Sequence, residues 1–96
     1  LNRVGRPVLI TPARLLSGDL PDDIDDVVVM LDPGTAFVAL PPDGLSIYWG
    51  AYLGTEDELL IAGPLADVAD EIVRVRAEAK ERKGWMFDTY LLRRER

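Results

Sequence analysis

The sequence predicts a single α+β domain over residues 1–96, in which an antiparallel-rich sheet of about five or six strands carries one long helix on one face. Three observations lead to this prediction. An amphipathic stretch in the second half lies between helix start and stop signals. Short apolar runs are separated by turns that contain proline and glycine. The 96 residues, 48% of them hydrophobic, are enough for one modest core.

The long helix is expected over residues 64–83. Pro64 suits the first helical position, and Gly84 suits the left-handed conformation just past the end. Acidic residues come early and basic residues late, which complements the helix dipole. Apolar residues recur between the two ends at helical spacing: Leu65, Val68, Ala69, Ile72, Val75 and Ala79.

Strands are expected on both sides of the turn at residues 32–35. Residues 27–31 contain three consecutive valines, which are stiff at χ1 and favour a pleated surface. The Asp-Pro-Gly-Thr turn should return the chain as a second strand over residues 36–40. With residues 45–53, these two strands would form an antiparallel meander.

The ends of the chain and the segment before the helix complete the prediction. Residues 8–11, between two prolines, are expected as an edge strand, and residues 12–17 as a short helix. Residues 58–62 should form a strand that leads into the long helix. The aromatic-rich residues 85–92 are expected as a last strand, with a short helix as the alternative.

The longest predicted strand divides into two faces. Alternate residues should meet the helix: Leu45, Ile47, Trp49, Ala51 and Leu53. The opposite set should face away from it: Ser46, Tyr48, Gly50 and Tyr52. Because one helix covers one face of a sheet, either the chain's own termini or a second molecule must cover the other.

Aromatic side chains are the candidates for an interface, being large and amphipathic. They are Tyr48, Tyr52, Trp85, Phe87 and Tyr90. The sequence therefore predicts a homodimer through the second sheet face. The equally weighted alternative is that Tyr48 and Tyr52 pack under the chain's own termini.

Arg76 lies within the apolar arc of the predicted helix. The favoured interpretation is that the helix extends past the sheet and Arg76 reaches solvent at its edge. The alternative is a buried arginine that faces an acid or a bound anion.

Missing residue types narrow the chemistry. The chain has no cysteine and no histidine, which removes zinc–thiolate sites and the commonest general base. No phosphate-binding loop, dinucleotide fingerprint or nucleophile elbow is present. The acidic residues 19–26 lack the spacing of a calcium-binding loop. We therefore expect no catalytic residues, no metal and no cofactor. A non-catalytic protein is expected more than an enzyme.

Charge is segregated along the chain. Residues 1–14 carry +3, residues 15–73 carry −13, and residues 74–96 carry +4, within a net charge of −6. The acidic block could dock a basic protein, or the basic block could contact nucleic acid, although the net charge argues against the latter. The favoured interpretation is that the blocks meet within the fold or across a dimer.

The predicted function is a small acidic, non-catalytic interaction or regulatory module that self-associates. The first alternative is a nucleic-acid-associated regulator that uses the basic C-terminal helix and tail. The second is a small carboxylate-dependent enzyme. With no membrane-spanning apolar run, a cytoplasmic location is expected. Arginine far outnumbers lysine, which indicates a bacterial or phage source, and the start at Leu1 indicates a trimmed N-terminus.

Overall fold

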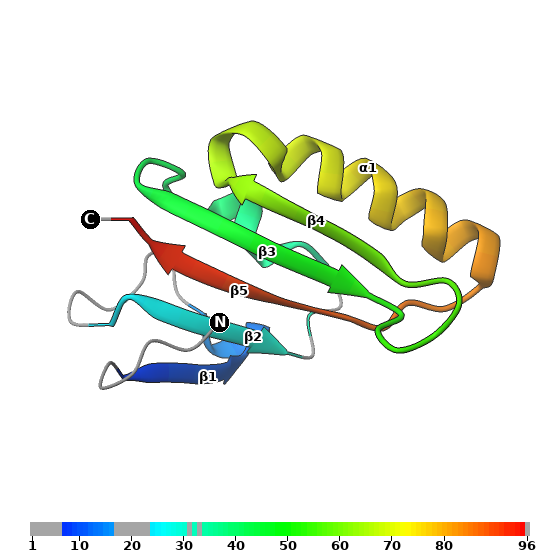
Figure 1. Cartoon of the computed structure of the whole chain (residues 1–96), viewed down its shortest axis with the longest axis horizontal. Helices are drawn as coiled ribbons and strands as arrows, with labels where there is room; N and C mark the ends of the chain where they lie inside the picture. The colour runs from blue at the N-terminus through cyan, green and yellow to red at the C-terminus, as the bar shows by residue number, and fades with distance from the viewer. Residues whose placement is uncertain (1–6, 17–23, 31, 33, 96) are drawn as a thin grey trace.

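The structure is a computed structural model that describes residues 7–16, 24–30, 32 and 34–95. One five-stranded sheet has the strand order β1-β2-β5-β3-β4 (Figure 1). Strands β1 and β2 pair in parallel, and every other neighbouring pair is antiparallel. One long helix, α1, packs on β3 and β4. The α+β class and the antiparallel-rich sheet with one long helix on it are confirmed.

Helix α1 spans Leu65–Lys83, one residue shorter than predicted. Pro64 precedes it as the N-cap residue, and Gly84 ends it in the left-handed conformation with φ of 81°. The Gly84 amide donates to the Lys80 carbonyl at 2.8 Å, which satisfies one of the carbonyls left open at the helix end. The stop signal at Gly84 is therefore confirmed, whereas Pro64, expected as the first helical residue, ends β4 and precedes the helix.

The strands follow the predicted order along the chain, except that the strand expected over residues 36–40 is absent from the described structure. They are β1 (Val8–Pro12), β2 (Asp26–Met30), β3 (Leu45–Ala51), β4 (Leu59–Pro64) and β5 (Asp88–Arg94). Strand β5, the last in sequence, is inserted between β2 and β3. The aromatic-rich segment thus contributes a strand, which begins later than predicted.

The predicted strand over residues 36–40 is wrong, and so is the meander built on it. Ala36–Ala39 form a short 3-10 helix, η2. The Asp32 carboxylate accepts hydrogen bonds from the amides of Gly34 (2.8 Å) and Ala36 (2.9 Å), which curls the chain immediately after β2. The ring of Phe37 then packs edge-on against Tyr90, with ring centroids 5.2 Å apart. Local capping and one aromatic contact therefore outweigh the turn pattern.

A second 3-10 helix, η1 (Ala13–Leu15), follows β1. It occupies part of the short helix predicted over residues 12–17, and Ser17 lies outside the described residues. Ala13 of η1 and Phe37 of η2 belong to the same buried core as Ile72 of α1. The described helices therefore contribute to one core on one side of the sheet.

The predicted faces of β3 hold within the strand and fail beyond it. Leu45, Ile47, Trp49 and Ala51 are buried as expected. The strand ends at Ala51, and Tyr52 takes a positive φ of 53°, which breaks the alternation. Tyr52 is consequently buried and Leu53 is 41% exposed, the reverse of the prediction.

Within the described part of the chain, no helix is long and apolar enough to cross a bilayer.

Candidate functional site

Arg76 is the centre of a buried polar network. Its Nε donates to Asp88 Oδ2 at 3.0 Å, and its Nη2 donates to the main-chain carbonyl of Asp32 at 3.0 Å. The side chains of Arg76 and Asp88 are only 10% and 5% exposed. Arg76 therefore does not reach past the sheet edge to solvent, which was the favoured interpretation of the sequence, but lies in a buried ion pair.

The partners of Arg76 are themselves fixed by other strands. Asp88, the first residue of β5, also accepts a hydrogen bond from the indole Nε1 of Trp49 at 2.8 Å. The Asp32 carboxylate, besides its two amide donors, accepts the Tyr90 hydroxyl at 2.8 Å. Burial, together with the adjacent Asp32 carboxylate, raises the pKa of the Tyr90 hydroxyl. The network therefore ties α1 to β3, β5 and the loop after β2.

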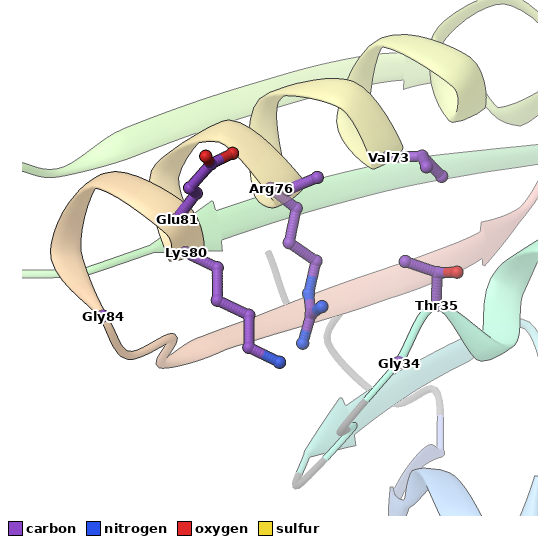
Figure 2. A pocket seen from close by; sticks show the side chains of 8 residues that line it. Gly34, Thr35, Val73, Arg76, Lys80, Glu81 and Gly84 are labelled. Carbon is purple, nitrogen blue, oxygen red and sulfur yellow. The ribbon is translucent and has the colours of Figure 1, made fainter.

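An open cleft of about 670 Å³ lies beside this network. One wall is the C-terminal half of α1, and the other is the loop that follows β2. Figure 2 shows the side chains of Arg76 and Lys80 extending from α1 toward the side where Gly34 and Thr35 lie. The lining residues are Gly34, Thr35, Val73, Arg76, Ala77, Lys80, Glu81 and Gly84. The loop follows the carboxyl end of β2, so the cleft lies between that end of the strand and the last turns of α1.

The predicted interface residues do not form one surface. Tyr52 and Tyr90 are buried within the chain, at 1% and 2% exposure, which corrects their proposed role in an interface. Tyr52 donates its hydroxyl to the Trp85 carbonyl at 2.7 Å and packs edge-on against the Trp85 ring. Trp85 and Phe87 are exposed at 52% and 60%. Tyr48 is half-buried, with the Arg93 guanidinium 5.5 Å from its ring centroid.

A second hollow, of about 400 Å³, lies on the sheet face opposite α1. Its lining is almost entirely apolar and includes Tyr48, Gly50, Leu53, Leu60 and Leu91. A Cβ atom on Gly50 would lie 2.7 Å from Leu53 Cδ2 and 3.2 Å from Leu60 Cδ2, so the glycine lets these two side chains lie close to the backbone of β3. Self-association through this face stays a prediction.

The described part of the chain contains no cluster of three or more acidic, histidine or cysteine residues that could hold a metal ion. Three members of the acidic run, Asp19, Asp22 and Asp23, lie outside the described residues. Asp26 is buried, and its Oδ1 accepts a hydrogen bond from Arg93 Nε at 2.8 Å. That ion pair joins the acidic and basic blocks within the fold.

Sequence reasoning singled out Arg76 but missed its partners. The only signal was an arginine on an apolar arc, which calls for an acid without saying which of the 17 acidic residues supplies it. Asp88 lies in the basic block of residues 74–96, and nothing in the sequence places Lys80 in a cleft.

No protein-family model matches this chain. A precorrin-6A synthase (deacetylating) from Sinorhizobium sp. is 48% identical over 94 residues, which covers 98% of this chain and 36% of that protein. A crystal structure described as a cobalamin synthesis related protein (CobF) from Corynebacterium diphtheriae superposes with a TM-score of 0.91 at 34% identity. It covers 99% of this chain and 40% of that one. The chain thus spans well under half the length of either protein.

These similarities overturn the function predicted from the sequence. The Sinorhizobium protein, which is 48% identical over 98% of this chain, is an enzyme. This finding contradicts the prediction of a non-catalytic interaction module. The two alternatives, a nucleic-acid-associated regulator and a small carboxylate-dependent enzyme, are corrected together with it. The chain lacks histidine, cysteine and the common catalytic motifs, but their absence does not exclude a role in an enzyme. Both similar proteins come from bacteria, consistent with the predicted source.

Proposed function

We propose that this chain acts as one part of an enzyme of cobalamin biosynthesis, with the activity named for its Sinorhizobium relative, precorrin-6A synthase. The observation that carries the proposal is the 48% identity over 94 residues, which runs through almost the whole chain. A shared fold alone does not imply a shared function, so the proposal rests on this sequence identity and not on the fold.

The size of the chain limits the role proposed for it. It corresponds to 36% of the relative, so we do not assign it the complete reaction on its own. In this proposal it supplies a structural unit and one wall of the site, and the remaining residues of such an enzyme supply the rest. The cleft beside Arg76, beyond the carboxyl end of β2, is the part of this unit that we propose faces that site. A cytoplasmic location belongs to the same proposal.

A segment exchange tests this proposal. The 94 matched residues of the Sinorhizobium enzyme are replaced with those of this chain, and the hybrid is introduced into a strain that lacks the enzyme and needs cobalamin to grow. We expect growth to be restored, because the inserted segment is 48% identical to the segment that it replaces.

The control is the same hybrid carrying Leu92→Ala, a substitution in the buried core that should lower the amount of folded protein and growth together. A hybrid that is soluble and unfolds cooperatively, yet does not restore growth, would contradict the proposal. The parent enzyme, expressed at the same level, sets the reference.

A further inference from the structure

The cleft beside α1 holds two cationic groups on the same side of the helix. Arg76 and Lys80 are four residues apart and both line the cleft, and Figure 2 shows both side chains extending from α1 in the same general direction. Like charges at this spacing repel each other by a few tenths of a kcal/mol. None of the ion pairs formed by the described residues includes Lys80. Lys80 therefore has no acidic partner in the described part of the chain, although it lies one helical turn from a buried arginine.

Two hydrogen bonds hold the Arg76 guanidinium in one orientation, but they use only some of its N–H donors. A guanidinium has five N–H donors, and the hydrogen bonds among the described residues use one on Nε and one on Nη2. The residue is 8% exposed and lines the cleft. An arginine fixed in this way is ready to bind a ligand without losing further side-chain freedom.

The neighbouring acids do not occupy these donors. The Asp88 oxygen that binds Arg76 also accepts the Trp49 indole, and the Asp32 carboxylate is held by two amides and the Tyr90 hydroxyl. The Glu81 carboxylate points away from Arg76 and Lys80 in Figure 2. Because Asp88 and Asp32 balance much of the local positive charge, attraction for an anion comes from Lys80 and the remaining Arg76 N–H groups. We expect an affinity in the millimolar range, typical of a small ligand held by few contacts.

We propose that this cleft binds the carboxylate group of a small organic acid between Arg76 and Lys80. A carboxylate is planar and presents two oxygens, which matches the edge of a guanidinium, and Lys80 adds a charge-assisted hydrogen bond. The Thr35 side chain lines the opposite wall. The proposal rests on this geometry alone and does not depend on the proposed enzymatic role.

The test is an NMR titration of the isotopically labelled chain with sodium acetate, with chloride adjusted to keep the ionic strength constant. Acetate is the smallest suitable carboxylate. We expect saturable shifts of the Arg76 Nε–H resonance and of the Gly34, Thr35 and Gly84 amides. Shifts that stay linear with acetate, or shifts confined to other parts of the protein, would overturn the proposal.

Two variants separate the cleft from general surface charge. Lys80→Met removes the ammonium group but keeps an unbranched side chain, and it should weaken acetate binding about fivefold, as expected for one partly exposed charged contact. Arg82→Met, on an exposed position of the same helix outside the cleft, should leave binding unchanged. Equal weakening by both variants would overturn the assignment of the site.

A parallel titration with inorganic phosphate identifies the class of anion. We expect phosphate to shift the same resonances less than acetate at equal concentration, because the Asp88 and Asp32 carboxylates near Arg76 repel its second negative charge. Saturable binding of phosphate without binding of acetate would overturn the choice of a carboxylate.

Discussion

The two faces of the sheet are built from the same strands but have different surroundings. On the α1 side, Val27, Ile47 and Leu92 are completely buried, and α1, η1 and η2 all contribute to the core there. On the opposite side, one apolar row crosses all five strands, and no helix of the described residues contributes to it. The row is Ile10, Val28, Leu91, Tyr48 and Ala62.

The difference shows which apolar side chains stabilise the fold and which ones remain exposed on the isolated chain. Ile10 and Leu60 are 65% and 68% exposed on the second face, so their burial adds little to the stability of the isolated chain. The polar network around Arg76 lies on the covered side, where α1 and the loop after β2 hold it in place. Substitutions matched between the two faces test this division.

The largest difference is expected between two leucines. Leu92→Ala should lower the free energy of unfolding by about 2–5 kcal/mol, because it leaves a cavity in the covered core. Leu60→Ala, on the second face, should change it by less than about 0.5 kcal/mol. Urea unfolding followed by tryptophan fluorescence measures both. Similar losses for the two leucines would mean that the second face is covered in solution.

The next largest effect is expected for the buried ion pair. Arg76→Leu should cost about 3 kcal/mol, because it leaves the Asp88 carboxylate buried with the Trp49 indole as its one remaining side-chain partner among the described residues. The matched control is Arg74→Leu, which breaks an exposed pair with Glu78 at 3.5 Å and should cost no more than about 0.5 kcal/mol. Thermal unfolding of the two variants at one pH compares them. An Arg76→Leu protein as stable as the Arg74→Leu protein would show that the network does not stabilise the fold.

A smaller effect is expected at the hollow of the second face. Gly50→Ala places a methyl group 2.7 Å from Leu53 Cδ2, so the ends of two flexible leucine side chains must move. We expect a loss of about 1 kcal/mol, at the low end for overpacking, since the neighbours are side chains and not backbone. Chemical denaturation gives the value. A gain in stability would mean that the hollow is simply an unfilled void.

The smallest effect on folding, and the most informative for association, is expected for Leu60→Glu. It should leave the unfolding midpoint almost unchanged while removing the self-association predicted through the second face. Light scattering at micromolar concentration compares the masses of the parent chain and the variant. A parent chain that is already monomeric would rule out the predicted homodimer under these conditions.

The sequence predicted the helix, the strands and the inward set of β3 because each depends on local patterns. Proline and glycine mark the ends of α1, and alternation marks β3 up to Ala51. It failed at residues 36–40, where the Asp32 carboxylate accepts hydrogen bonds from nearby amides and Phe37 packs against the distant Tyr90, a contact that a turn pattern does not encode. Tyr52 was misplaced because a positive φ on a residue other than glycine leaves no trace in a pattern of alternation.

The candidate site could be predicted only in part. Arg76 was conspicuous because a charged residue on an apolar arc must either reach solvent or find a partner. Its partners lie 12 and 44 positions away in the chain, and the insertion of β5 into the middle of the sheet brings them together. No local pattern encodes that insertion. The prediction of a non-catalytic protein had no such structural cause, because it followed from the absence of histidine, cysteine and catalytic motifs in a chain that spans 36% of its enzymatic relative.

The most direct measurement for the proposed role is product formation by the purified segment-exchange hybrid. The hybrid and the parent Sinorhizobium enzyme are supplied with the same substrate, and the rate at which precorrin-6A forms is measured. We predict a rate within about tenfold of the parent rate, a loss of about 1.4 kcal/mol in transition-state stabilisation. A folded hybrid that binds substrate but forms no precorrin-6A would contradict the assignment of this chain to such an enzyme.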